Sequence, residues 1–388
     1  MNQKKGSSPA RIQNCNRVKT KTATNVCLKK RIESIRAHLA QLQTCGSVWA
    51  CCICSSVISE RRCIELQYAF DIWRAFDPCN VATMITFTTP HNLSQSLADV
   101  LYLQDKAIRI MKNQPQRGKY KVWRTIIDEM MSVGSFTGRE VTYGIFFGWH
   151  PHRHECYLNI KASKKQLETW RFELAHAFSI AFRKAGGQID DWCAFMKRSV
   201  CMDQITDDNG FSHISSYITK VEGDTWTLAQ EATKGSAKTS KKGNITPFGM
   251  LEHIREGKEH SILYSQKFYE YAITMHGKRQ FFASKGLKQF LGVNFKTDEE
   301  HLKDSEGGNH YYNFTDKEWA QIINLDIRGE IIALTEDRNE FEFIAALDNI
   351  LKEYDQEYIG TSQPRVNWLN EKQELKERYN KKNGELVI

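Results

Sequence analysis

The sequence predicts an α+β fold with a central, mostly antiparallel sheet, and three observations support this prediction. Strand-like and helix-like patterns alternate between residues 81 and 221. The stretch 81–89 is rich in β-branched residues and alternates in polarity, which is typical of a strand. A second strand pattern over 139–147 continues through Gly148 into a further extended segment, and two adjacent strands form a hairpin.

The helices around these strands follow from apolar spacing and from capping residues. The clearest is Lys165–Lys184, whose large apolar side chains repeat at helical spacing and form one buried face. Thr246 and Pro247 begin another helical region, which continues to about residue 291, because a hydroxyl side chain caps the backbone and proline suits the first turn. The remaining expectations are a helix-compatible stretch at 32–42, helices at 58–73, 96–111, 124–131, 341–354 and 368–379, a strand at 200–205, and a capping box at Thr315 and Glu318.

The composition is ordinary for a globular protein and carries a modest positive charge. Of the 388 residues, 41% are hydrophobic and 26% are charged, which allows a packed core. The net charge of +8 favours a polyanionic partner, although such basicity is also common among proteins that do not bind nucleic acid. The sequence has no run of about 18 apolar residues and no apolar signal segment, so we expect a cytoplasmic protein without a membrane partner.

The cysteines indicate a metal site. Their number, 11, is odd and they cluster early in the chain, which favours reduced thiols with some metal ligation over a disulfide framework. Cys51 and Cys54 have the C-x2-C spacing with which two thiolates bind one zinc ion from a tight turn, and Cys45 is a third candidate. A structural zinc site needs four ligands, and the candidates for the fourth are Cys15, Cys27, Cys52 and Cys63. The alternative is a set of buried thiols that hold no metal.

Three histidines fall on alternate positions directly after Gly148. In an extended segment, residues two apart share a face, so His150, His152 and His154 line one side while Arg153 and Glu155 face the other. Imidazoles on one rigid strand can hold a divalent ion and leave coordination positions open for a substrate. The alternative is an edge strand with chance histidines, but only 12 residues of the whole chain are histidine.

Tyr217 and Lys220 lie three residues apart within the segment 212–221. On a helix such residues are neighbours, so the hydroxyl and the ammonium can reach one site. This spacing occurs often by chance, and without the histidines it would indicate only a solvated helix face.

Three stretches together resemble the replication initiators of rolling-circle plasmids, which belong to the HUH endonuclease group. In chain order they are similar to the family's opening strand, its metal motif and its nucleophile motif, at Met84–His91, Gly148–His154 and Tyr217–Lys220. The resemblance also takes in Cys45–Cys51 with Cys54, Arg139–Gly144, Thr246–Phe248 and Gly277–Gln280, and it covers roughly residues 15 to 295.

The resemblance implies an HUH-type nuclease domain that nicks single-stranded origin DNA. Tyr217 would attack a phosphodiester and leave a 5′-phosphotyrosine and a free 3′-OH that primes a host polymerase. Tyrosine has a pKa of about 10, so attack at neutral pH needs a nearby cation such as Lys220 or the metal ion. The implied partners are single-stranded and hairpin origin DNA and a host helicase and polymerase; a homodimer is compatible with the sequence, which does not determine the oligomeric state.

The resemblance also implies a catalytic metal ion, Mn²⁺ or Mg²⁺. His152 and His154 would hold the ion, which would polarise the scissile phosphate. His150 is a further ligand or only a neighbour. Glu140, on the paired strand, is either an oxygen ligand or a structural salt-bridge partner.

A second, structural metal ion follows from the family's cysteines. The family's upstream cysteine corresponds to Cys15, so the resemblance favours Cys15 as the fourth Zn²⁺ ligand beside Cys45, Cys51 and Cys54. Cys52 stands where the family usually has proline, which makes it a competing ligand.

Two further positions depart from the family pattern. The middle residue of the metal motif is usually apolar but here is Arg153, which predicts that this face meets solvent or DNA. Some relatives carry a glutamate one turn before the nucleophile, where this chain has His213. We expect His213 either to assist the terminating cleavage by water or to contact a DNA phosphate.

These motifs predict five regions. They are a basic N-terminal arm over 1–40, a zinc-binding knuckle and helix over 41–75, an HUH endonuclease domain over 80–233, a helical extension over 245–296 and a C-terminal helical region of unknown role over 310–388. The arm is equally compatible with disorder and with contact to DNA phosphates. Two other functions stay open: a single-tyrosine HUH transposase or relaxase, and a zinc-stabilised DNA-binding regulator without catalysis. Mere binding needs neither the histidines nor Tyr217 and Lys220, so their joint presence favours the enzyme.

Overall fold

The chain forms two compact units in a computed structural model. The structure describes residues 11–30, 37–115, 121–206, 210–211, 215, 244–335 and 338–360, the last eight of these as backbone only. Unit 1 comprises residues 1–16 and 44–305, and unit 2 comprises residues 17–43 and 306–388.

Unit 1 is built on an antiparallel sheet of five strands in the order β6-β3-β5-β4-β7. The strands are β3 (Asn80–Thr88), β4 (Gly134–Gly144), β5 (Gly148–Ile160), β6 (Val200–Ile205) and β7 (Phe281–Ala283). This confirms the α+β class and the antiparallel sheet. The sequence did not reveal β7, which lies inside the stretch expected to be helical, because its three residues are too few to show a pattern and their strand conformation depends on pairing with β4.

The two central strands form a hairpin around a three-residue turn. Gly144 pairs with Gly148, so β4 ends three residues earlier than the pattern over 139–147 predicts. Gly148 has a φ of 79°, and a Cβ atom there would lie 2.9 Å from the carbonyl oxygen of Asn92. Glycine is therefore the residue that lets the chain turn into β5 against this neighbouring loop.

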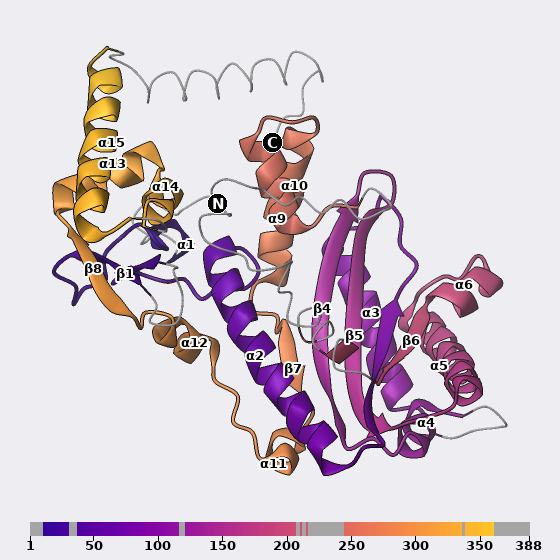
Figure 1. Cartoon of the computed structure of the whole chain (residues 1–388). Helices are drawn as coiled ribbons and strands as arrows, with labels where there is room; N and C mark the ends of the chain where they lie inside the picture. The colour runs from indigo at the N-terminus through magenta and orange to yellow at the C-terminus, as the bar shows by residue number, and fades with distance from the viewer. Residues whose placement is uncertain are drawn as a thin grey trace, which may run out of the picture. The chain divides into compact units, whose positions relative to one another are not determined.

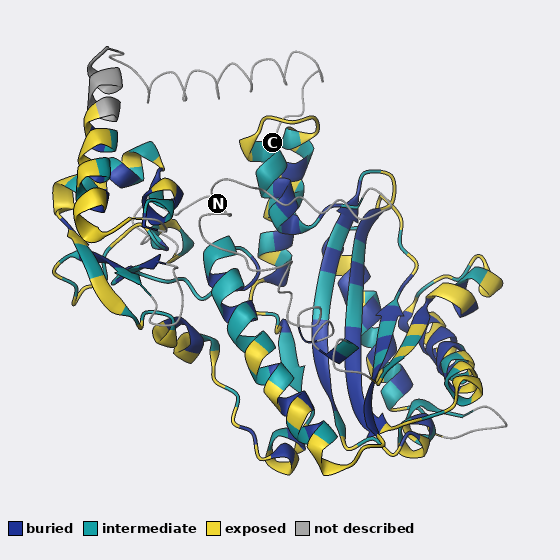
Figure 2. Ribbon diagram, viewed as in Figure 1, coloured by how far each residue is buried: buried dark blue, intermediate teal, exposed yellow. Residues whose placement is uncertain are grey.

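Helices cover both faces of the sheet. On one face lie α3 (Leu97–Lys112), α4 (Trp123–Glu129), α5 (Lys164–Ala185) and α6 (Trp192–Arg198). Their core includes Phe87 and Phe178, whose ring centroids are 5.3 Å apart (Figure 1). On the other face, Phe70 of α2 (Cys52–Phe76) packs edge-on against Phe136 of β4. Figure 2 shows that the buried positions follow β5 and the inner side of α5. Each fully buried phenylalanine contributes roughly 1.5–3 kcal/mol to folding.

The last part of unit 1 returns to the sheet through four helices. These are α9 (Pro247–Arg255), α10 (Ser261–Met275), α11 (Leu287–Leu291) and α12 (Asp298–Asp304); the short α1 (Arg11–Asn14) precedes the sheet. The expected cap is confirmed, because the Thr246 hydroxyl accepts a hydrogen bond from the Gly249 amide at 3.1 Å. Tyr271 of α10 stacks on Trp149 at the start of β5.

Unit 2 combines an early segment and a late segment of the chain. Its sheet has the order β2-β1-β8, from β1 (Val26–Lys30), β2 (Ala37–Ala40) and β8 (Asn309–Phe314). Its helices are α13 (Asp316–Leu325), α14 (Arg328–Ala333) and α15 (Glu340–Gly360), and the capping box of Thr315 and Glu318 is present.

This unit differs from the expected division of the chain. Residues 37–40 form a strand where the sequence is compatible with a helix, and residues 17–30 belong to a folded unit instead of a basic arm. The reason is tertiary: Leu28 and Phe314 are both fully buried in neighbouring strands, so pairing overrides local preference.

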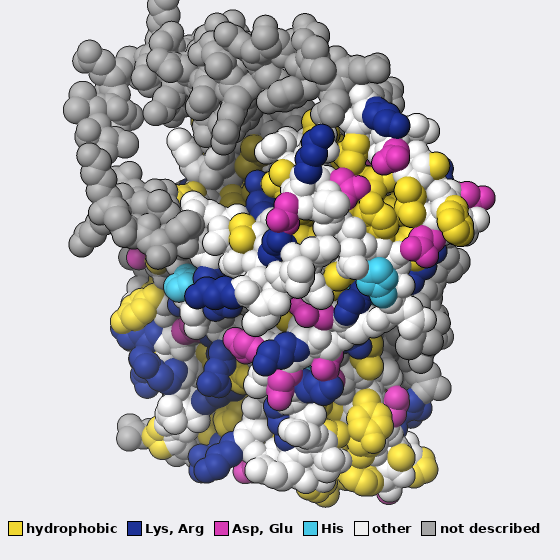
Figure 3. Space-filling model, turned by 90° about the vertical axis from the view of Figure 1, so that its left-hand side faces the viewer, with side chains coloured by type: hydrophobic (Ala, Val, Ile, Leu, Met, Phe, Trp, Pro, Cys, Tyr) yellow, Lys and Arg dark blue, Asp and Glu magenta, His cyan; other side chains and the backbone are white. Residues whose placement is uncertain are grey.

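Two properties of the described surface bear on partners. None of the described helices combines the length and the apolar character needed to cross a bilayer. On the face that Figure 3 shows, Lys and Arg side chains are interspersed with Asp and Glu side chains. The positive net charge is therefore not gathered into one field on that face.

Candidate functional site

The three histidines line one face of β5, between its two neighbouring strands. His152 lies opposite Thr88 of β3 and Glu140 of β4, and His154 lies opposite Thr86. Alternate residues of a strand share a face, so these side chains are on the same face of β5 as Cys156 and Leu158, which pack against α2.

Threonine hydroxyls of β3 hold two of the imidazole rings. The Oγ1 atom of Thr88 lies 2.9 Å from Nδ1 of His152, and the Oγ1 atom of Thr86 lies 3.0 Å from Nδ1 of His154. A hydrogen bond on Nδ1 fixes the orientation of a ring and presents Nε2 as the ligand atom, as in protein metal sites. The register of the hairpin thus prepares two imidazoles on one face.

Glu140 lies beside this pair. Its Oε2 atom is 3.2 Å from Nε2 of His154, which is 1% exposed, whereas the Glu140 side chain is 21% exposed. The structure therefore brings Glu140 to the histidines, and the contact serves either an ion pair or an oxygen ligand beside an imidazole.

His150 is held by a fourth histidine, His91, which follows β3. The Nδ1 atom of His91 donates to the Thr89 carbonyl at 2.9 Å, so its Nε2 atom accepts from Nδ1 of His150 at 3.0 Å. Burial lowers the pKa of His91, which favours this neutral form. The ring centroids of His150 and His152 are 4.3 Å apart. The imidazoles therefore form one row along the sheet, in the order His91, His150, His152 and His154.

His91 is the functional candidate that the sequence did not single out. It stands at the end of the stretch Met84–His91, but its approach to His150 depends on how the chain turns after Thr89. Thr86 and Thr88 also follow from the register of β3 against β5, which no pattern within β3 reveals.

The donor atoms of this row suit a transition-metal ion. The imidazoles are borderline ligands and the carboxylate is a hard one, and Mn²⁺ and similar ions accept this mixed set more readily than Mg²⁺, which prefers oxygen ligands alone. The histidine row, however, is extended along the strand and does not form a compact set of ligand atoms. Among the described residues, the group of three or more ligand atoms that lie close together is a cluster of cysteines.

That group consists of Cys15, Cys45, Cys51 and Cys54, whose sulfur atoms all lie within 4.8 Å of one another. The sulfur of Cys15 is 3.6 Å from that of Cys51 and 3.5 Å from that of Cys54, and the sulfurs of Cys45 and Cys54 are 3.8 Å apart. Four thiolates at 2.3 Å from a tetrahedral zinc ion have sulfurs about 3.8 Å apart. The cluster therefore fits a structural metal ion such as zinc.

The local fold explains this cluster. Cys51 caps the N-terminus of α2 and accepts from the Cys54 amide at 3.5 Å, so the two thiols are placed by one helical turn. Sulfur contacts lower the pKa of Cys45 and raise those of Cys51 and Cys54, because only part of such a cluster can ionise without a cation. Cys52 is not a member of the group.

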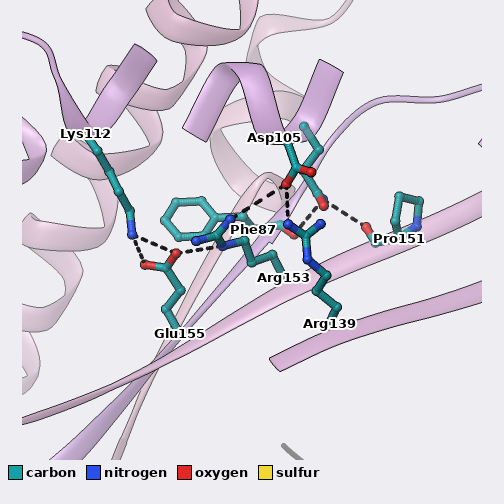
Figure 4. Close-up of polar contacts among 8 residues, drawn as sticks. Phe87, Asp105, Lys112, Arg139, Pro151, Arg153 and Glu155 are labelled. Carbon is teal, nitrogen blue, oxygen red and sulfur yellow. Dashed lines mark hydrogen bonds and ion pairs between the residues drawn. The ribbon is translucent and has the colours of Figure 1, made fainter. Parts of the chain in front are cut away.

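On the opposite face of β5, Arg153 is less open to solvent than expected. We expected this side chain to meet solvent or DNA, but it is only 13% exposed, because it packs beside α3 and is bound by carboxylates, and its accessible part lines a hollow under that helix. Its Nε atom donates to the buried Glu155 at 2.8 Å, and Glu155 also accepts from Lys112 of α3 at 2.8 Å (Figure 4). Burial raises the pKa of Glu155, but the charges of Lys112 and Arg153 outweigh it and lower that pKa.

Tyr217, Lys220 and His213 lie outside the described residues. The described residues next to them in the sequence include Phe211 and Ser215. The Phe211 ring centroid is 5.2 Å from that of Phe70 on α2, and the Ser215 hydroxyl is 3.1 Å from Oε1 of Gln67, also on α2. Both residues therefore lie on the side of the sheet that carries the histidine row.

The described geometry thus contains a row of four imidazoles with one carboxylate and a separate cluster of four thiols. Comparison with known proteins adds no relative from which a role could be carried over. No family model, curated protein or solved structure matches this chain.

Proposed function

We propose that unit 1 is an HUH-type nuclease domain and that the protein initiates rolling-circle replication by nicking single-stranded origin DNA. Tyr217 would be the nucleophile, and His152, His154 and Glu140 would hold a divalent ion, preferentially Mn²⁺. The observation that carries the proposal is the pair of imidazoles that the Thr86 and Thr88 hydroxyls orient on one face of the central hairpin.

Three features of the described residues support this proposal over a protein that only binds DNA. Hydrogen bonds on the Nδ1 atoms of both rings are the outer-shell arrangement that metal-ligating histidines have in known sites. Glu140 adds an oxygen donor 3.2 Å from His154. Phe211 and Ser215, which precede Tyr217 by six and two residues in the sequence, lie on the face of the sheet that carries the histidine row.

In the proposed reaction the Tyr217 oxygen attacks the phosphorus atom of the scissile phosphodiester. The bond from phosphorus to the 3′-oxygen breaks, so the products are a 5′-phosphotyrosine and a 3′-hydroxyl that takes up a proton. A bound divalent ion supplies positive charge next to the phosphate oxygens, where negative charge grows in the transition state. Lys220 stabilises the tyrosinate by its charge, because the free hydroxyl has a pKa of about 10.

The experiment compares wild-type protein with Tyr217→Phe and with the control Tyr269→Phe, which alters an exposed tyrosine of α10. Each protein is incubated with Mn²⁺ and labelled oligonucleotides that tile the DNA flanking the coding sequence. A denaturing gel then separates free DNA from covalent adduct. We expect an adduct with wild type and with Tyr269→Phe, and none with Tyr217→Phe, which should still bind the same oligonucleotide.

An adduct that persists in Tyr217→Phe would assign the nucleophile to another residue. Sequence-specific binding without any adduct, in wild type and in Mn²⁺, would instead favour a DNA-binding regulator. Transposition or conjugal transfer would be indicated if the adducted strand is joined to a second, unrelated DNA and no circular single strands are released.

A further inference from the structure

A solvent-open hollow of about 520 Å³ lies on the face of the sheet opposite the histidine row. Positively charged side chains dominate its lining. The lining includes Asp105, Lys106, Arg109 and Lys112 of α3, Arg139 of β4 and Arg153 of β5. Five of these side chains are cationic and one is a carboxylate.

The floor of the hollow places two arginines directly across from each other. Arg139 and Arg153 are register partners on β4 and β5. Like charges in this position destabilise a sheet. The chain offsets this cost with two carboxylates: Asp105 accepts from Arg139 at 2.8 Å and lies 3.7 Å from Arg153, and Glu155 accepts from Arg153 at 2.8 Å (Figure 4).

These carboxylates hold the arginines in place but neutralise only part of the positive charge around them. Lys112 shares Glu155 with Arg153, so the floor has three cations and two carboxylates. Lys106 and Arg109 on the wall add two more positive charges. Five cations and two carboxylates thus give this region a net positive charge.

One donor of Arg139, a residue that lines the hollow, has no partner among the described residues. The Nη1 atom of Arg139 is buried and makes no hydrogen bond there, although its Nη2 atom is bound to Asp105. An unsatisfied buried donor destabilises a protein, and the penalty disappears when a ligand oxygen accepts the hydrogen bond. Guanidinium groups held rigidly by carboxylates are also well prepared to bind the oxygens of a phosphate.

We propose that this hollow is a binding site for a phosphate group, in which Arg139 and Arg153 contact the phosphate oxygens and Lys106 and Arg109 add charge from the wall. The group belongs either to a free phosphate compound or to the backbone of a nucleic acid. The site lies behind the histidine row and uses none of its residues, so it does not rest on the proposed nicking activity.

The first test compares wild type, the wall variant Lys106→Ala/Arg109→Ala and the control Lys164→Ala/Lys165→Ala. The control removes the same charge from the exposed start of α5. Inorganic phosphate binding is measured by thermal shift and by isothermal titration. We expect affinity to fall about tenfold in the wall variant and to stay within about twofold of wild type in the control.

The second measurement identifies the source of the phosphate group. A short fluorescent oligothymidine is titrated by anisotropy at several salt concentrations. If the ligand is a nucleic-acid backbone, the slope of log K against log salt should fall by about 1.4 in the wall variant, since each lost phosphate contact removes about 0.7. If the ligand is a free phosphate compound, the slope stays unchanged while inorganic phosphate binding falls.

Arg139→Gln tests the floor, with a melting curve to show that the variant is folded. It should weaken phosphate binding at least as much as the wall variant does, because it removes the buried donor itself. All titrations are made without added divalent ions and without a chelator, which leaves the cysteine cluster undisturbed, and are repeated with His154→Ala, so that failure of the nicking proposal leaves this test intact. Unchanged affinity for both probes in both the wall variant and Arg139→Gln would overturn the proposal.

Discussion

Replacing Cys15 by serine tests whether the cysteine cluster holds a structural metal ion. Cys15 is 30 residues away from Cys45, so a metal ion bound by both closes a loop of that length. If the metal ion acts as a cross-link, the loop-closure entropy is about 3.6 kcal/mol at 25 °C. For a unit of this size, each kcal/mol shifts the melting temperature by about 2–4 °C. We therefore expect Cys15→Ser to melt about 7–14 °C below wild type.

The assay combines elemental analysis of freshly purified protein with a melting curve followed by circular dichroism. Wild type should contain one tightly held zinc per chain, and a strong chelator should lower its melting temperature towards that of Cys15→Ser. Cys52→Ser is the matched control, because Cys52 is next to Cys51 in sequence but outside the cluster. It should keep its zinc and melt with wild type. A zinc-free wild-type protein that melts together with Cys15→Ser would refute the reasoning.

Three further predictions follow from other contacts. The Glu270 carboxylate accepts hydrogen bonds from the buried Leu97 amide at 2.7 Å and from the buried Trp149 indole at 2.9 Å. Glu270→Ala leaves both donors without an acceptor, so it should lower the free energy of unfolding in urea by about 2–6 kcal/mol. Burial raises the pKa of the Glu270 carboxyl, but the hydrogen bonds outweigh this effect, so that the folded pKa is below the unfolded value of about 4.3. The ionised carboxylate therefore stabilises the fold fully above about pH 4.3, and this stabilisation is lost as the pH falls through the lower folded pKa. The unfolding free energies of wild type and Glu270→Gln should converge in acid. Oligonucleotide nicking should need less Mn²⁺ than Mg²⁺ and should be lost in His154→Ala, and equal cleavage in EDTA would contradict this. Thr315→Ala should destabilise unit 2 by about 1 kcal/mol, measured by hydrogen exchange of its amides, with unit 1 unchanged.

The central hairpin could be predicted from the sequence because its signals are local. Alternation places His152 and His154 on one face, and β-branched residues identify β3 as a strand. The distance from Glu140 to His154 also follows once β4 and β5 are paired across a short turn. In each case the residues that matter are within about a dozen positions of each other or in strands that the pattern itself identifies.

The remaining features could not be predicted because their partners come from distant parts of the chain. Arg153 looked like a solvent-facing departure, since nothing near it in sequence shows that Asp105 would lie 3.7 Å away on α3. The buried Glu155 gave no sign of its ion pair with Lys112. Such contacts depend on how a helix packs on the sheet. Hydrophobic spacing predicts which face of the helix meets the sheet, but it does not predict which residues of the helix lie opposite which residues of the strands.

The sheet of unit 2 sets a constraint on the order of events during synthesis. Cys27 in β1 is paired with Asn313 in β8, 286 residues later. At about 5–20 residues per second, a ribosome needs about 15 to 60 seconds to make the second strand after the first. Throughout that time β1 has an edge without its partner, and Lys29 and Lys30 near the end of that edge discourage pairing with another chain. Unit 2 is therefore completed after nearly all of unit 1 has left the ribosome, which makes its assembly one of the last steps in the folding of this protein.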